Sequence, residues 1–187
     1  MNSKSYQNEI GYLLQNYLHP LEVKNEWIAF RNFPKQYSPR VDIAVGPFNI
    51  DPYNNQTSTY NDLLDDEKIR MFLREVYNLH KEHCRKNEIS IPDFENLINN
   101  NQNARCFLAI EIEYRNTKKH VMGSIVNATS LGRVGIGVAY DSKTLTTFFR
   151  ILKYLAYLKA VEKTTYDTSS FLIVTKEQLL ELVTKII

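Results

Sequence analysis

Two acidic residues stand two positions apart in a strongly apolar segment of the chain. Residues 106–114 read CFLAIEIEY, and Glu111 and Glu113 interrupt its hydrophobic run. The pattern predicts a buried strand, in which alternate side chains point to opposite faces. A carboxylate in such surroundings is costly unless it is paired, hydrogen-bonded or bound to a cation. One face is expected to hold Phe107, Ala109, Glu111 and Glu113, and the other Cys106, Leu108, Ile110 and Ile112.

A third carboxylate meets the same constraint. Asp42 lies between Val41 and Ile43 in the segment VDIAV. Three acids embedded in two apolar strands indicate one shared site for a divalent metal, because ions such as Mg²⁺ bind through carboxylate and carbonyl oxygens plus water. The alternative is that both strands lie at a sheet edge, where the acids face solvent or pair with Lys and Arg. The spacing alone leaves both interpretations open.

The elements that must position these acids predict an α/β fold with a central mixed β-sheet flanked by helices. In the first half, a helix is expected over 5–18, hairpin strands over 22–30 and 38–48, a turn-rich loop over 49–61, a helix over 65–86 and an Asn-rich loop over 96–105. After the acidic strand, helices are expected over 118–132, 145–163 and 177–187, and strands over 134–141 and 169–175. This alternation favours a sheet covered on both sides.

Composition sets the broad class. The chain has 187 residues, of which 43% are hydrophobic and 24% charged. These values predict a single domain over residues 1–187 with a real core, and they exclude a disordered or fibrous protein. The net charge of +2 is well below the basic excess of many autonomous nucleic-acid binders. Basic residues exceed acidic ones mainly after residue 100, which suits either a phosphate-facing surface or a solvated helix face.

Localisation signals are also informative. No stretch approaches the roughly 20 apolar residues that a membrane helix needs, and the polar start MNSKSYQNE lacks the apolar region of a signal peptide. We therefore expect a soluble cytoplasmic protein without membrane contact. Cys84 and Cys106 are too few for a disulfide framework and are interpreted as reduced packing residues.

Weaker motifs have structural interpretations. His80, His83 and Cys84 have helical spacing that suits a transition metal, but a fourth ligand is missing, so a solvent-facing helix stripe is the better interpretation. Gly132, Gly135 and Gly137 enter a strand instead of leading into a helix, which favours close packing over a phosphate-binding loop. A candidate partner or dimer surface, or else an ordinary polar rim, is formed by Arg150, Lys153, Tyr154 and Tyr157.

The order of elements and the position of the acids resemble the core of the PD-(D/E)xK nuclease superfamily, which includes many restriction endonucleases. In PRVDIAVGPF, Asp42 falls on the first metal-binding Asp of that family. Glu111 falls on its second acid, and Glu113 on the position that usually holds Lys. This last residue departs from the common pattern, although some restriction enzymes of the superfamily carry an E-x-E variant and remain active.

A longer segment narrows the resemblance. Residues 109–141, AIEIEYRNTKKHVMGSIVNATSLGRVGIGVAYD, more closely resemble catalytic small subunits of heterodimeric type IIS restriction endonucleases. In those systems a large subunit recognises DNA and cuts one strand, and the small subunit makes the second cut. The resemblance implies a restriction endonuclease-like fold, Mg²⁺ as cofactor with Mn²⁺ as a substitute, double-stranded DNA as substrate, a larger DNA-recognition subunit as partner and the cytoplasm of a bacterium.

The resemblance also implies roles for residues. Asp42, Glu111 and the backbone carbonyl of Ile112 would hold Mg²⁺, while Glu113 would position or deprotonate the attacking water or ligate a second metal. Accessory candidates are Glu9 and Glu26 as an extra ligand, Lys118 or Lys119 as the missing positive charge, and His120 as a phosphate contact.

Two rival functions stay open at this point. One is a self-sufficient homodimeric restriction or repair nuclease of the same superfamily. The other is a catalytically silent module that keeps the nuclease fold for interaction, for which Glu113 is the argument. The sequence contains no recognisable helix-turn-helix with a basic recognition helix, zinc finger or basic arm, which favours an enzyme whose specificity comes from another polypeptide.

Overall fold

The computed structural model describes residues 2–30, 35, 37–49, 51 and 56–185. Five strands form one sheet in the order β1-β2-β3-β4-β5. The strands are β1 (Val23–Ile28), β2 (Arg40–Val45), β3 (Cys106–Glu113), β4 (Gly132–Ala139) and β5 (Phe171–Thr175). The helices are α1 (Ser3–Tyr17), α2 (Thr57–Leu64), α3 (Glu67–Lys86), α4 (Phe94–Asn99), α5 (Lys118–Leu131), α6 (Ser142–Ala160) and α7 (Lys176–Lys185).

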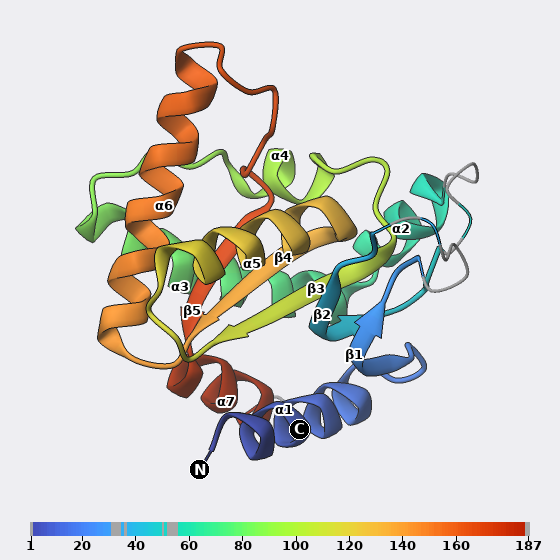
Figure 1. Cartoon of the computed structure of the whole chain (residues 1–187). Coiled ribbons are helices and arrows are strands. Elements are labelled where there is room, and N and C mark those ends of the chain that lie inside the picture. Colours follow the sequence, from blue (N-terminus) through green and yellow to red (C-terminus); the bar gives the residue numbers. More distant parts are fainter. Residues whose placement is uncertain (1, 31–34, 36, 50, 52–55, 186–187) are drawn as a thin grey trace.

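The sheet is mixed, which confirms the predicted fold class. β2 pairs antiparallel with both β1 and β3, whereas β4 pairs parallel with both β3 and β5. Helices enclose the sheet from two sides: α5 and α6 cover one face, and α1, α3 and α7 pack on the other (Figure 1). Every residue of β4 is buried, as expected for a central parallel strand.

Two short helices lie in segments predicted to be loops. α2 buries Tyr60 and Leu64, and α4 buries Phe94, Leu97 and Ile98. These helices are too short to be stable in isolation, so tertiary burial stabilises them where local propensity does not. The sequence prediction is wrong here because it weighed the polar residues of both segments more than their few apolar anchors.

The Asn-rich segment before β3 surrounds a buried cation. Arg133 on β4 is fully buried, and its guanidinium donates to the main-chain oxygen of Asn101 at 2.9 Å. It also donates to Oδ1 of Asn61 at 2.9 Å and of Asn99 at 2.8 Å. Neutral amide oxygens thus take the place of a carboxylate partner for the two terminal nitrogens, whereas among the described residues the buried Nε of Arg133 has no hydrogen-bond partner.

Side chains of β3 follow the predicted alternation from Leu108 to Glu113. The prediction is wrong at the start of the strand, where Phe107 packs in the layer of α1 and α3 and Cys106 in the layer of α5 and α6. The pairing with β2 covers only Leu108 to Ile110, and the pairing with β4 skips Phe107 between Cys106 and Leu108, so the alternation breaks at this residue.

Other structural interpretations are confirmed. A Cβ atom on Gly137 would lie 2.5 Å from the Phe171 ring, so this glycine is needed for close packing. Cys84 and Cys106 are free and buried, and burial raises the pKa of Cys84 to about 12. Thr175 and Gln178 form a capping box at the start of α7 through reciprocal side-chain to backbone hydrogen bonds. Within the described ranges, none of the helices has the length and apolar character needed to cross a bilayer.

The predicted solvent-facing stripe on α3 is wrong, because His80 and Cys84 are buried against the sheet. His80 Nδ1 accepts a hydrogen bond from the Ile173 N–H of β5 at 3.0 Å, and its Nε2 lies 3.2 Å from Cys84 Sγ. Burial lowers the pKa of His80 to about 3, with a further contribution from the nearby charge of His83. The ring is therefore a neutral, hydrogen-bonded part of the core.

We expect His80→Asn to weaken the acid sensitivity of the fold, because Asn keeps an acceptor for Ile173 and cannot titrate. In the wild type the unfolded chain takes up a proton near pH 6.5 that the folded protein rejects down to about pH 3, so stability falls as the pH drops through this range. The slope of unfolding free energy between about pH 6 and about pH 4 should decrease by up to about 1.4 kcal/mol per pH unit. Denaturant unfolding across this range checks it, and equal slopes would contradict it.

Candidate active site

The centre of the site is the point where β2 and β3 separate. Their pairing ends at Ile43 and Ile110, so Asp42 and Glu111 stand opposite each other one step beyond the last pair. Asp42 Oδ2 accepts a hydrogen bond from the Ile112 N–H at 2.7 Å. The carboxylate thus replaces a strand carbonyl as the acceptor, which holds it between the two diverging strands.

Both glutamates of β3 point toward α5, as the predicted alternation requires. Glu111 is only 5% exposed, and its Oε1 accepts a hydrogen bond from Asn127 Nδ2 at 3.3 Å. Glu113 is half-buried, and its Oε1 accepts a hydrogen bond from Ser124 Oγ at 2.7 Å. The interpretation of these acids as solvent-facing edge residues is therefore wrong for Glu111.

The three acids carry more negative charge than their surroundings balance. Burial is the largest cause of a raised pKa at Asp42, Glu111 and Glu113. Asp42 further raises the pKa of both glutamates, and Glu26 raises that of Asp42. Such mutual repulsion is typical of sites that bind a cation or perform proton transfer.

Glu113 has a hydroxyl partner and exposed basic neighbours of its own. Although burial raises its pKa, the hydrogen bond from Ser124 and the charges of His120 and Arg115 lower it. His120 lies in the first turn of α5 and is exposed. His120 therefore lies within electrostatic reach of Glu113, and its predicted contact with a phosphate stays a prediction.

A cavity of about 260 Å³ opens beside Asp42 on the side of α1. Gln7 of α1 is buried, and its Nε2 donates to the Asp42 main-chain oxygen at 2.6 Å and to Glu26 Oε1 at 3.0 Å. The amide therefore fixes Glu26 relative to Asp42. The cavity is lined by Ser3, Lys4, Gln7, Glu26, Arg40, Asp42, Ile112 and Tyr114.

Glu26 interrupts the β1–β2 ladder between the pairs Asn25–Ile43 and Trp27–Val41. Its φ of 53° lies in the left-handed region that side chains rarely adopt. Its carboxylate accepts a hydrogen bond from Lys4 Nζ at 2.9 Å and forms an ion pair with Arg40 Nε at 2.8 Å. Burial raises its pKa, but these partners and Gln7 outweigh burial and lower it. A strained residue held by three partners is typical of functional sites.

The accessory residues predicted from the sequence divide into two groups. Glu26 and Ile112 lie at the site, and His120 acts on it electrostatically. Glu9 is exposed on α1, and Lys118 and Lys119 are exposed at the start of α5. Within the described chain, none of these last three lines the cavity beside Asp42.

Sequence reasoning missed Gln7, Lys4 and Arg40. Gln7 was detectable in principle, because it lies at helical spacing on the apolar stripe of Ile10 and Leu14 and is the polar interruption of that stripe. Lys4 and Arg40 carry no comparable signal, since they come together through the packing of α1 on β1 and β2.

The point where β2 and β3 separate, with Asp42 and Glu111 on its two sides, is called the acidic fork below. It offers few side-chain ligands for a metal ion. Among the residues that the structure describes, no group of three or more His, Cys, Asp or Glu side chains is arranged to hold a metal ion. Mg²⁺ commonly binds through one or two carboxylates and keeps several waters. Asp42 and Glu111, two partly or fully buried carboxylates, therefore fit Mg²⁺ or Mn²⁺ better than a metal that requires four side-chain ligands.

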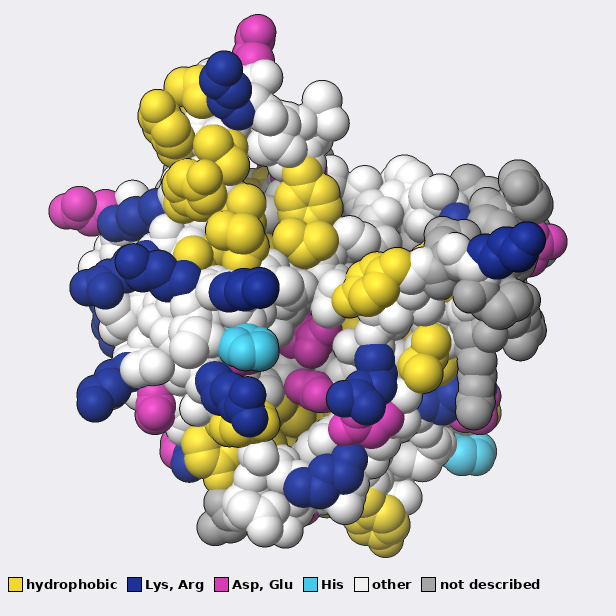
Figure 2. Space-filling view, in the orientation of Figure 1, with side chains coloured by type: hydrophobic (Ala, Val, Ile, Leu, Met, Phe, Trp, Pro, Cys, Tyr) yellow, Lys and Arg dark blue, Asp and Glu magenta, His cyan; other side chains and the backbone are white. Residues whose placement is uncertain are grey.

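The surface around the site combines opposite charges. Figure 2 shows acidic side chains in a hollow near the centre of one face, with Lys and Arg side chains and a His around them. Hydrophobic side chains gather above this hollow, over α6. On that helix Tyr154 is 47% and Tyr157 60% exposed, while Arg150 and Lys153 are also exposed, so the predicted face is accessible.

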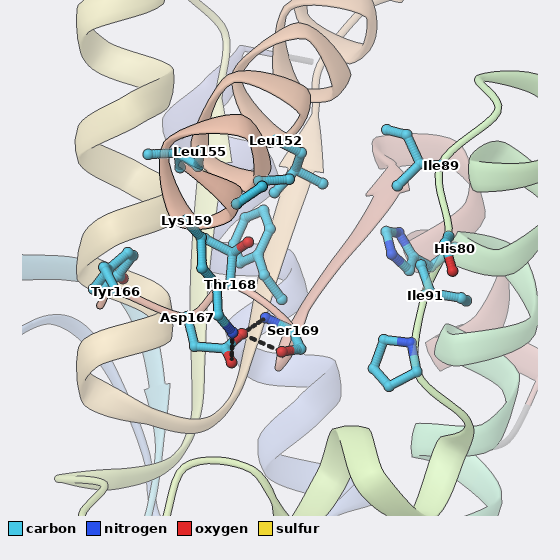
Figure 3. A pocket seen from close by; sticks show the side chains of 15 residues that line it. His80, Ile89, Ile91, Leu152, Leu155, Lys159, Tyr166, Asp167, Thr168 and Ser169 are labelled. Carbon is cyan, nitrogen blue, oxygen red and sulfur yellow. Dashed lines mark hydrogen bonds and ion pairs between the residues drawn. The ribbon is translucent and has the colours of Figure 1, made fainter. Parts of the chain in front are cut away.

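A larger cavity lies elsewhere and lacks comparable chemistry. It measures about 660 Å³ and lies between α6, residues 166–169 and residues 89–92 (Figure 3). Its two charged residues, Lys159 and Asp167, form an ion pair with each other, and Asp167 also accepts a hydrogen bond from the Ser169 N–H. His80 also lines this cavity, but both of its ring nitrogens already contact other protein groups, Ile173 N–H and Cys84 Sγ. The acidic fork is therefore the better candidate for an active site.

A scan against protein-family models and searches of curated proteins and of solved structures find no match to this chain. The resemblance to PD-(D/E)xK nucleases therefore stays a prediction from the residues around Asp42, Glu111 and Glu113. The α/β fold with its mixed five-stranded sheet is established independently of that resemblance.

Glu111→Gln should stabilise the metal-free protein. The folded-state pKa of Glu111 is raised well above 4.5, so its ionised form costs stability that increases as the pH rises above that value. In EDTA we expect the unfolding free energy to rise by about 1 kcal/mol or more near pH 8 and to change little near pH 4.5. Denaturant unfolding measures both, with Glu75→Gln on the exposed face of α3 as the control. Destabilisation near pH 8 would contradict the assignment.

Proposed function

We propose that this chain is a Mg²⁺-dependent DNA endonuclease, acting as the catalytic small subunit of a type IIS restriction system. It cuts one strand of double-stranded DNA, and a larger subunit recognises the site and nicks the other strand. The observation that carries the proposal is the fork at Asp42, where a carboxylate bonded to the Ile112 N–H stands opposite a second, buried carboxylate at Glu111.

The chemistry of the fork suits phosphodiester hydrolysis. Asp42, Glu111 and the Ile112 carbonyl would hold the metal ion, which when bound supplies charge neutralisation at the scissile phosphate and lowers the pKa of a bound water. The Ile112 N–H and Asn127 keep the two carboxylates oriented. Because both side chains are fixed before substrate arrives, little reorganisation is needed during the reaction.

Glu113 is the proposed base. Its raised pKa brings it closer to neutrality, where a general base works best, and Ser124 Oγ holds one carboxylate oxygen in place. The other oxygen is then available to orient the attacking water and accept its proton. In this arrangement the E-x-E pattern is a functional variant, with glutamate performing a task that lysine does not.

Asp42→Asn should abolish cleavage. Conversion of supercoiled plasmid to nicked and linear forms in Mg²⁺ should slow by at least about 100-fold, because the variant loses a charged ligand while Asn can still accept from Ile112. Asp62→Asn, an exposed carboxylate on α2, is the matched control and should cut at the wild-type rate. Cutting by Asp42→Asn at the native rate would make the site assignment wrong.

The role of a recognition subunit is tested in the same assay. We expect little or no cutting by the chain alone and site-specific cutting when the larger subunit encoded alongside it is added. Site-specific cleavage by the chain alone would instead indicate a self-sufficient nuclease. No cleavage in any combination, together with normal folding, would indicate a silent interaction module.

Glu113→Lys should lower the cleavage rate by about tenfold or more, because the change removes the base and the acceptor of the Ser124 hydrogen bond. Single-turnover rates with the wild type and the variant measure this effect. A faster variant would show that no residue of the wild type performs the function that lysine usually performs at this position in the superfamily.

A further inference from the structure

The positive charge that is missing at Glu113 is present on the opposite side of Asp42. Lys4 of α1 and Arg40 of β2 line the same cavity as Asp42. Both charges lower the pKa of Asp42, so they lie within electrostatic reach of its carboxylate.

Both cations are accessible from solvent. The side chains of Lys4 and Arg40 are 59% and 64% exposed, compared with 32% for Glu26 between them. Arg40 bonds Glu26 through Nε, so within the described chain its two terminal nitrogens remain for a second anion. A planar fork of this kind matches the geometry of a phosphate group.

Glu26 holds the two cations together and partly neutralises their charge. One carboxylate accepts a hydrogen bond from Lys4 and forms an ion pair with Arg40, while Gln7 ties the same group to the Asp42 main chain. The backbone of Glu26 lies in the left-handed region, with a φ of 53°, which strains a residue with a side chain. The result is a pair of cations positioned beside Asp42 and partly neutralised by an internal carboxylate.

We propose that Lys4 and Arg40 bind a phosphate group of the DNA strand beside Asp42, and that Glu26 positions them while competing for their charge. This inference rests on the proposed function and locates the positive charge of the site on α1 and β2. It assigns Lys4 and Arg40 as substrate-binding residues and Glu26 as a positioning residue.

The proposal predicts effects of opposite sign within one ion-pair network. Lys4→Met and Arg40→Gln remove phosphate contacts and should weaken DNA binding, whereas Glu26→Gln releases both cations and should strengthen it. A purely structural network predicts losses in all three variants. Lys4→Arg keeps the charge and should bind as the wild type does.

The experiment is fluorescence anisotropy of a labelled duplex of about 20 base pairs in EDTA, where no cleavage occurs. We expect Lys4→Met and Arg40→Gln each to weaken binding about threefold or more, with a salt slope smaller by about one, and Glu26→Gln to tighten it. The neighbouring exposed ion pair of Lys24 and Glu22, which lies outside the cavity lining, supplies the controls. Lys24→Met and Glu22→Gln should leave the affinity within a factor of about 1.5.

The outcomes separate this inference from the proposed function. Unchanged binding in Lys4→Met and Arg40→Gln, weaker binding in Glu26→Gln, or equal effects in the control pair would each overturn the phosphate site, even if the wild type cuts plasmid in Mg²⁺. The expected binding pattern in a protein that never cuts would support the phosphate site and overturn the nuclease proposal. A wild type that binds no duplex would overturn both.

Discussion

The hydrogen bond from the Ile112 N–H to Asp42 Oδ2 is the interaction on which the candidate site depends. It lies where β2 and β3 part, so it satisfies a backbone donor that the ladder leaves without a strand partner and orients a carboxylate in the same contact. The carboxylate then stands opposite Glu111. Elements on both sides of the sheet support this arrangement, α1 through Gln7 and α5 through Asn127 and Ser124.

Gathering these acids opposes folding. Burial and mutual repulsion raise the pKa of all three, which means that their ionised forms are less stable here than in water. The surrounding core offsets this cost, since β4 is buried throughout and the two terminal nitrogens of Arg133 donate to asparagine oxygens. A stable scaffold that carries locally unfavourable charge is the usual relation between a fold and a functional site.

The sequence predicted the features that depend on local periodicity. The alternation in CFLAIEIEY correctly directed Glu111 and Glu113 to one face, and Asp42 stood out as an acid in an apolar strand. The sequence alone could not predict features that tertiary contacts create. Lys4 meets Asp42 only after α1 packs on the hairpin, and His80 is buried by β5, which lies 93 residues away along the chain. The short helices α2 and α4 were missed for the same reason.

The central claim is that Asp42 and Glu111 together hold a divalent metal ion. Its most direct test is a crystal structure of the protein with Mn²⁺, in which anomalous scattering locates the ion. We expect Mn²⁺ between the two carboxylates and near the Ile112 carbonyl, with no ion at this position in crystals of Asp42→Asn. A Mn²⁺-loaded crystal with no ion at the fork, or an ion bound only at other residues, would contradict it.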